Sequence, residues 1–233
     1  MAMTSQEVRQ SLRELDDLRY SAGPLDEALR RIVLATHRLF AVDGAGLMLL
    51  DPDQLLRNVA VSDKRLDHLE QLQVQHGDGP CIDAFEEKTL VDAVDLVDEK
   101  RWPMFTSAAV ERGLRAVLAS PIPYNRHAIG VVVVFSAKVR PWSPEGELAL
   151  VTFTDLAAMC IANTMQSEER GELAAQLHRA LNARVVIEQA KGVLVARQGL
   201  SQREAFERMR HQARRERRRV ADVAAEIMAT VRR

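Results

Sequence analysis

A short segment, Pro141-Trp142-Ser143-Pro144, divides this 233-residue chain into two parts with different residue patterns. No proline follows Pro144, and apolar residues recur there every three or four positions, which is typical of amphipathic helices. Before the segment, short apolar runs alternate with turn residues, which is typical of mixed helices and strands. The chain is therefore expected to join an α+β domain to a helical C-terminal region.

The first part predicts a sheet with helices around it. Apolar runs on both sides of Asp51-Pro52-Asp53 predict a β-hairpin. The apolar run at 131–135 predicts a strand that is buried on both faces or central in its sheet. Further strands are expected at 89–93 and 115–120, and helices at 6–20, 25–40, 66–75, 81–87 and 102–112.

The second part is expected to begin with one long helix. Ser143 is a suitable N-cap, and Pro144 suits the first helical position. The apolar stripe of this helix is too long for a single domain to cover, although Gly171 interrupts it. Such a stripe is most easily buried against the same helix of a second chain, so we expect a coiled coil and a homodimer.

The last fifty residues predict three amphipathic helices that share one small core. The first spans 183–198, and Gly199 ends it. Ser201 and Glu204 have the spacing of a capping box at the start of the second, and the third follows from Val220. We expect the core to centre on Phe206, the only aromatic residue in this region.

Charge is divided unevenly between the two parts. The whole chain holds 32 Lys and Arg against 33 Asp and Glu. Residues 166–233 hold 15 basic and 9 acidic side chains, a net charge of +6, which leaves −7 for the first 165 residues. A basic tail on an acidic body predicts a polyanionic partner for the tail, and a solvated basic helix face is the alternative.

The basic tail offers specific candidates for phosphate contacts. Arg184 and Lys191 are seven residues apart and so share one helix face, and Gly192 would let a backbone approach closely. Arginine suits this role because its planar guanidinium can bind phosphate or a guanine edge through two bonds. Alternatively, Lys191 and Arg210 form ion pairs with the glutamates three positions before them. The full set of candidates is Arg184, Lys191, Gly192, Arg210, Arg214, Arg217 and Arg219.

The acidic body contains fewer candidate functional side chains. Cys81 lies at the expected start of a helix, where the helix dipole lowers a thiol pKa. A sensing thiolate is therefore one interpretation of Cys81, and a small buried packing residue is favoured over it. Trp102 and Phe105 either line a pocket or fill the core, and the core is favoured. With Phe85, these residues are the ligand-pocket candidates.

Several classes of protein are excluded. Two cysteines, Cys81 and Cys160, cannot form a disulfide framework, which indicates a reducing cytosol. The N-terminus lacks the apolar core of a signal peptide, and the longest apolar run, 128–135, is far shorter than the roughly 20 residues that span a bilayer. No GxSxG, GxxxxGK, HExxH or CxxC motif occurs, and His76 and His127 lack metal-ligand spacing. We expect a cytoplasmic protein without membrane contact, metal or enzymatic activity, and no cofactor is identified.

The C-terminal region resembles the ANTAR domain, the RNA-binding module of transcription antitermination regulators. The resemblance is carried by RVVIEQAKGVLV at 184–195, SQREAF at 201–206, Met209-Arg210 and VADVA at 220–224. It covers about 172–230 and implies a three-helix bundle that binds paired RNA hairpins, so the basic candidates become RNA-binding candidates. One departure is Arg217, which stands where the family usually has Asn.

The preceding part is similar to GAF domains of the kind fused to ANTAR domains in actinobacterial regulators. The similarity is carried by GDGPCIDA at 77–84, RWP at 101–103, SPIP at 120–123 and Ile129-Gly130. It implies an antiparallel sheet flanked by helices, with a small-molecule pocket on one side. The expected organisation is an N-terminal helix at 1–21, a GAF-like sensor domain at 22–165, and a linker helix with an ANTAR-like domain at 166–233.

Together, these features predict a cytoplasmic sensor-regulator. The GAF-like domain would detect a signal, the long helix would transmit it, and the ANTAR-like bundle would bind nascent RNA and prevent terminator formation. Two alternatives stay open. One is a DNA-binding regulator whose last helices act as a helix-turn-helix, and the other is a GAF-type reductase that depends on Cys81.

Overall fold

The computed structural model describes residues 25–125, 127–166 and 172–230. These residues form two compact units. The sheet unit runs to Leu49 and from Leu56 to Ala174, and the helical unit comprises Leu50–Leu55 and the residues from Ala175 onward. Each unit has its own apolar core. The helix expected at 6–20 lies outside the described residues.

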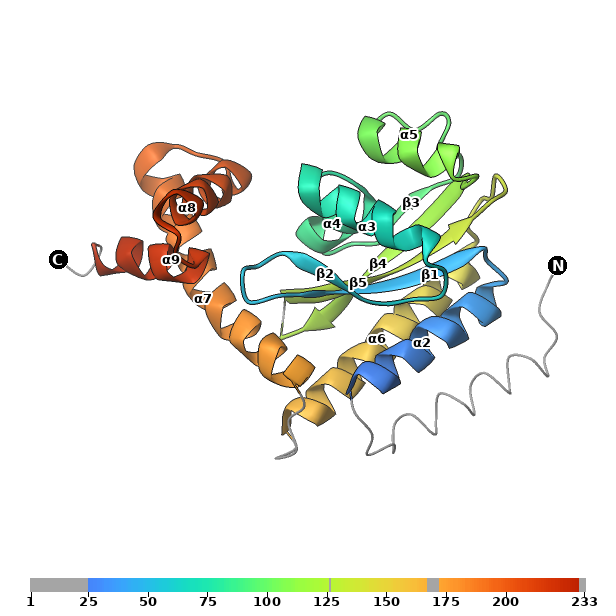
Figure 1. Cartoon of the computed structure of the whole chain (residues 1–233), viewed down its shortest axis with the longest axis horizontal. Helices are drawn as coiled ribbons and strands as arrows, with labels where there is room; N and C mark the ends of the chain where they lie inside the picture. Colours follow the sequence, from blue (N-terminus) through green and yellow to red (C-terminus); the bar gives the residue numbers. More distant parts are fainter. Residues whose placement is uncertain (1–24, 126, 167–171, 231–233) are drawn as a thin grey trace. The chain divides into compact units, whose positions relative to one another are not determined.

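The sheet unit is built on a five-stranded antiparallel sheet with the strand order β2-β1-β5-β4-β3 (Figure 1). The strands are β1 (Gly44–Leu50), β2 (Leu56–Val61), β3 (Val91–Ala93), β4 (Ala116–Tyr124) and β5 (His127–Ser136). Strand β5 pairs with β1 on one side and β4 on the other, and its residues from Ala128 onward are buried. The predicted central strand is therefore confirmed.

The expected hairpin joins β1 to β2 through a turn that begins at Asp51. One carboxylate oxygen of Asp51 accepts hydrogen bonds from the backbone N–H groups of Asp53 and Leu55, both at 2.9 Å. The Leu55 carbonyl in turn accepts from the Asp51 N–H at 2.8 Å. A short acidic side chain that satisfies backbone groups in this way stabilises the turn.

Helices cover both faces of this sheet (Figure 1). Helices α2 (Leu25–Phe40) and α6 (Pro144–Gln166) lie side by side on one face. Helices α3 (Arg65–His76), α4 (Pro80–Glu87) and α5 (Pro103–Glu111) cover the other. Proline opens α4, α5 and α6, since its missing N–H is unpaired at a helix start in any case. The left-handed Gly77 ends α3, because that conformation is easily adopted by glycine.

The helical unit contains α7 (Glu172–Gln198), α8 (Gln202–Glu216) and α9 (Val220–Ala229). Ser201 caps α8 as predicted: its hydroxyl accepts from the Glu204 N–H, and the Glu204 carboxylate accepts from the Ser201 N–H. The buried core is formed by smaller side chains, among them Ile187 and Met209. The prediction that Phe206 is the centre of this core is wrong, because Phe206 is only partly buried against it.

The long helix expected after Pro144 is described in two parts. Helix α6 ends at Gln166 and α7 begins at Glu172, and the intervening residues are outside the described part. The continuous helix and the coiled coil therefore stay predictions. No helix among the described residues combines the length and apolar character needed to cross a membrane.

Candidate functional site

Arg184, the first of the basic candidates, is not on the surface. Its side chain is 7% exposed and lies on the same side of α7 as the buried Leu177, Ala180 and Ile187. Burial lowers the pKa of the guanidinium, and the nearby Glu188 raises it. The expectation that Arg184 is an exposed neighbour of Lys191 is therefore wrong, because this face of α7 is turned inward.

Lys191 and Arg210 form the ion pairs that were the alternative to phosphate binding. The Lys191 ammonium lies 3.0 Å from the Glu188 carboxylate, and the Arg210 guanidinium lies 3.0 Å from Glu207. Both cationic side chains are less than a fifth exposed. Gly192 is exposed, and a Cβ built there would meet nothing within 4 Å, so no internal contact requires glycine at this position.

The remaining candidates are exposed at the end of α8 and in the loop that follows. Arg214 lies in the last turn of α8, and Arg217 and Arg219 lie between α8 and α9. Arg217 adopts the left-handed conformation that ends α8, with φ of 52°, and its N–H bonds to the carbonyls of Ala213 and Arg214. The structure therefore places these three cations on one short segment that is anchored by a helix C-cap.

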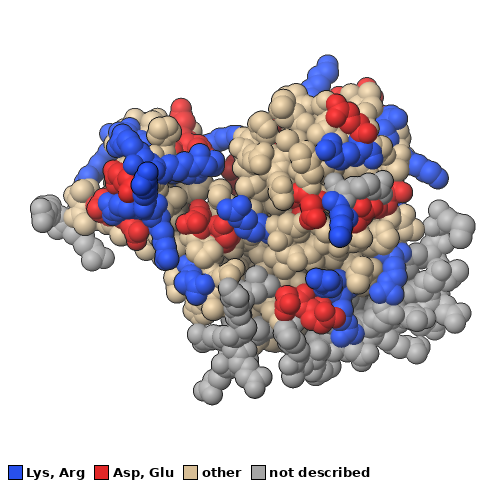
Figure 2. Space-filling view, in the orientation of Figure 1, with Lys and Arg blue, Asp and Glu red and all other residues tan. Residues whose placement is uncertain are grey.

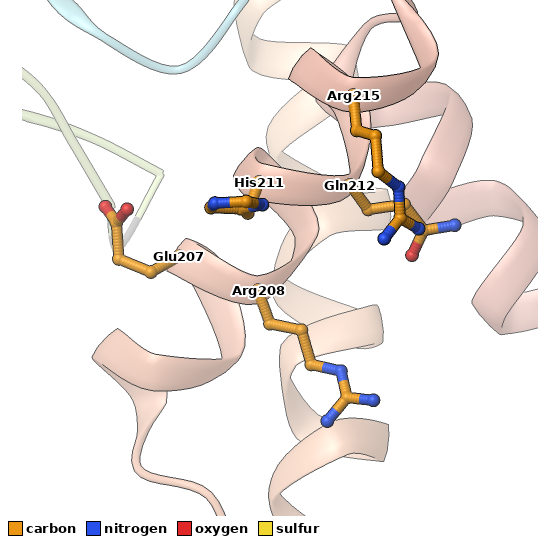
Figure 3. Close-up of a pocket in the computed structure, with 5 residues that line it drawn as sticks. All are labelled: Glu207, Arg208, His211, Gln212 and Arg215. Carbon is orange, nitrogen blue, oxygen red and sulfur yellow. The ribbon is translucent and has the colours of Figure 1, made fainter.

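A groove on α8 contains functional candidates that the sequence analysis missed. It has a volume of about 470 Å³ and is lined by Glu207, Arg208, His211, Gln212 and Arg215. The spacing of three, four and seven residues places these side chains on one helix face. Figure 3 shows Gln212 and Arg215 close together and Glu207 pointing away from them. Repetition of polar donors at helical spacing was the signal that could have identified them.

This surface combines several positive charges with hydrogen-bond donors. Figure 2 shows Lys and Arg side chains gathered over the helical unit, with fewer acidic side chains among them. Glu216 accepts a hydrogen bond from Gln212 at 3.1 Å and pairs with Arg218 at 3.3 Å, while Arg218 also pairs with Glu226 at 2.8 Å. Among the described residues, no carboxylate lies within ion-pair distance of Arg208 or Arg214. These guanidinium groups are therefore available to phosphate oxygens.

The four ligand-pocket candidates of the sheet unit belong to its packed core. Cys81, Trp102 and Phe105 are at most 1% exposed, and Phe85 packs against them as a partly buried side chain. The Trp102 indole N–H donates to the Asp83 carboxylate at 2.7 Å. The favoured interpretation, that Cys81, Trp102 and Phe105 pack in the core, is confirmed by their burial.

Cys81 lacks the environment of a reactive thiolate. Burial raises the pKa of the Cys81 thiol strongly, and the negative charge of Glu70 adds to the effect, whereas a hydrogen bond from Gln73 opposes it. The Gln73 side chain also accepts a hydrogen bond from the Cys81 N–H at 2.8 Å. Because the thiolate is the nucleophile, a thiol held neutral does not support the reductase alternative.

A second cavity, which the sequence analysis did not identify, lies between β1, β2 and α3. Its volume is about 420 Å³, and its polar lining residues are Arg57, Asn58, Glu70, Gln71 and Gln75. Glu70 is fully buried, and neither of its carboxylate oxygens has a hydrogen-bond partner among the described residues. Burial raises the pKa of Glu70 well above its usual range, and the charge of Asp67 raises it further.

The fold and these sites define a protein with an α+β sheet domain followed by a basic helical bundle. Residues 24–161 match the family model of the GAF domain, and residues 175–228 match that of the ANTAR domain. The chain therefore belongs to the GAF family and carries an ANTAR domain after its GAF domain. ANTAR domains are RNA-binding parts of antitermination regulators and GAF domains are sensors, so this chain is a regulator of that general kind.

Solved structures with a similar fold include GAF domains. One is the GAF domain of the Acinetobacter phosphoenolpyruvate-protein phosphotransferase, at 20% identity and a TM-score of 0.56, covering 70% of this chain and 96% of that one. Another is the corresponding domain from Coxiella burnetii, at 18% identity and a TM-score of 0.55, covering 70% of this chain and 96% of that one. A search of curated proteins finds no match. At these identities the likeness shows the fold alone.

Proposed function

We propose that this protein is a cytoplasmic, signal-responsive antitermination regulator that binds hairpin RNA through α8 and the loop after it. The observation that carries the proposal is the exposed cationic surface of the groove and its neighbours. Arg208 and Arg215 lie two helical turns apart in the groove, and Arg214, Arg217 and Arg219 lie close by along the chain. Cations held on a folded helix can bind phosphates with little loss of conformational freedom.

The groove also offers groups that can distinguish RNA from a uniform polyanion. Gln212 carries both a donor and an acceptor, and arginine can stack on a base as well as bind phosphate. Unstacked bases in hairpin loops are the usual targets of sequence-specific RNA recognition. Lys191, Arg210 and Gly192 would lie at the margin of such a contact, whereas Arg184 would support α7 from within.

The test is a mobility-shift titration of the full chain against an RNA that carries two short hairpins. The double variant Arg208→Ala/Arg215→Ala should weaken binding and lower the slope of log K against log salt by about 1.5, since each phosphate contact contributes about 0.7–0.9. The matched control is Lys100→Ala/Lys138→Ala, which removes two exposed charges from the sheet unit. An unchanged affinity for the groove variant would refute the proposed interface, and preferential binding of duplex DNA would favour the DNA-binding alternative.

We also propose that the protein acts as a homodimer. Leu148, Val151 and Met159 lie on one side of α6 and are 67%, 37% and 43% exposed. A second copy of α6 would bury this apolar face, and discrete packings of a helix pair could transmit a signal. Sedimentation equilibrium should show a dimer that Leu148→Glu weakens, and a monomer at micromolar concentration would refute this part of the proposal.

A further inference from the structure

The cavity between β1, β2 and α3 is lined by buried oxygen acceptors that have no hydrogen-bond partner among the described residues. Glu70 presents two buried carboxylate oxygens without a hydrogen-bond partner, and the side-chain oxygen of Asn58 is a third such atom. The Asn58 amide N–H is occupied, because it donates to the Asp67 carboxylate. Buried polar atoms are paired in the great majority of native structures, so three orphaned acceptors around one cavity need an explanation.

Glu70 is buried because it lies on the inward-facing side of α3. It lies on the same side of α3 as Leu66, Leu69 and Gln73, all of which are buried. Its carboxylate lies against β1, where a Cβ built on Gly46 would be 2.0 Å from one oxygen. Glycine at this position therefore makes room for the carboxyl group.

The charged and titratable groups around Glu70 make the inner wall of the cavity acidic. Asp67 lies one turn earlier on α3 and acts electrostatically on Glu70, and the Cys81 thiol on α4 is close enough to be affected by the Glu70 charge. Arg57 on β2 also lines the cavity, and its side chain is exposed. The inner wall thus offers oxygen acceptors and, once Glu70 is ionised, negative charge, whereas Arg57, the one cation among the described lining residues, lies on the exposed strand.

We propose that this cavity binds a small organic cation that presents N–H donors, such as a primary ammonium or an amidinium group, to Glu70 and Asn58. The inference rests on the proposed sensor function and names the class of ligand for that domain. A cationic N–H group supplies the hydrogen-bond donors and the positive charge that the wall lacks. It can donate to several acceptors and neutralise the charge of the carboxylate. A metal ion is less suitable, because no group of three His, Cys, Asp or Glu side chains in the described chain could hold one.

Binding of such a cation involves release of a proton. Burial raises the pKa of Glu70 and so favours its protonated form in the empty cavity, whereas an ammonium or amidinium partner favours the ionised carboxylate. The Glu70 O–H bond breaks as the proton leaves to solvent, and no other covalent bond changes. Affinity should therefore rise with pH over the range in which the empty Glu70 is protonated.

The test is titration calorimetry of the full chain with benzylamine and benzamidine, and with benzyl alcohol as the neutral analogue. We expect both cations to bind at millimolar concentrations, benzyl alcohol to bind at least about tenfold more weakly, and the heat to depend on the ionisation enthalpy of the buffer. Glu70→Gln keeps the shape of the side chain and should weaken cation binding about tenfold or more. Glu87→Gln, which removes an exposed carboxylate from α4, is the matched control and should bind like the wild type.

Asn58→Ala provides an independent check should Glu70→Gln disturb the fold, because Asn58 lies on a different element and is only partly buried. It should also weaken the binding of both cations. The proposal is overturned if neither cation binds at 20 mM, if benzyl alcohol binds as well as benzylamine, or if Glu70→Gln leaves the affinity unchanged. Because these titrations contain no RNA, their failure would leave the proposed RNA interface standing, and failure of the RNA titration would leave this site standing.

Discussion

The buried carboxyl of Glu70 predicts a specific dependence of stability on pH. Glu70 is fully buried without a hydrogen-bond partner in the described chain, and burial followed by the charge of Asp67 raises its pKa. Glu70→Gln removes the titratable group and keeps nearly the same volume. We expect the variant to be more stable than the wild type at neutral pH, because an amide has no charge to desolvate.

The magnitude follows from proton linkage. In the unfolded chain, Glu70 titrates near its ordinary pKa of 4.5, whereas in the folded chain it holds its proton to higher pH. The folded state is therefore favoured by this proton below pH 4.5, and the contribution is lost as pH rises towards the folded pKa. The loss amounts to at most about 1.4 kcal/mol per pH unit for one proton, over the range between the unfolded and the folded pKa of Glu70.

The assay is urea unfolding at pH 5, 6, 7 and 8. Both tryptophans of the chain, Trp102 and Trp142, lie in the sheet unit, so their fluorescence reports the unfolding of that unit. The free-energy difference between Glu70→Gln and wild type should grow with pH, while Glu87→Gln should follow the wild type at every pH. Parallel curves for wild type and Glu70→Gln would refute the reasoning, because they would show that Glu70 binds protons equally in both states.

Three further predictions test the packing of the sheet unit. Cys81 should resist alkylation by iodoacetamide in the folded protein and react once urea unfolds it, because burial keeps its thiol protonated; rapid labelling without unfolding would contradict this. Asp83→Ala should lower the free energy of unfolding by about 1–3 kcal/mol, since it leaves the buried Trp102 N–H without its acceptor, and urea unfolding measures the change. Gly130→Ala should disrupt the β1–β5 pairing and lower the melting temperature measured by circular dichroism, because the new Cβ would lie 2.3 Å from the Met48 carbonyl oxygen. An unchanged melting temperature would show that the two strands can move apart at little cost in free energy.

Much of the fold follows from local patterns in the sequence. The hairpin at Asp51, the central strand that contains 131–135 and the capping box at Ser201 each depend on residues close in sequence. Turn chemistry, apolar runs and capping spacing act over a few residues, so they can be recognised without knowledge of the rest of the chain. The two families were recognised for the same reason, because their motifs lie in short segments.

The burial or exposure of the candidate site residues depended on contacts between elements that are distant in the sequence. Helical spacing predicts that Arg184 and Lys191 share one face of α7. Spacing alone does not tell which face a neighbouring element covers, and Arg184 proved to be 7% exposed. The groove at Arg208 was missed because the face of α8 that stays exposed is set by the helices that pack against its other face. Likewise, Phe206 was expected at the centre of its core, whereas the close approach of three helices favours smaller side chains such as Ala190 and Ala205 there.

The sequence by itself determined where helices and strands form, because these depend on neighbouring residues and on the period of apolar side chains. Only the tertiary structure decided that Glu70 is enclosed against Gly46 while Arg208 stays in solvent. Both are charged residues on amphipathic helices, and nothing in their local sequence separates them. Their burial differs because it is set by residues that are distant along the chain and adjacent in space. Burial in turn sets the free-energy cost of holding a charge.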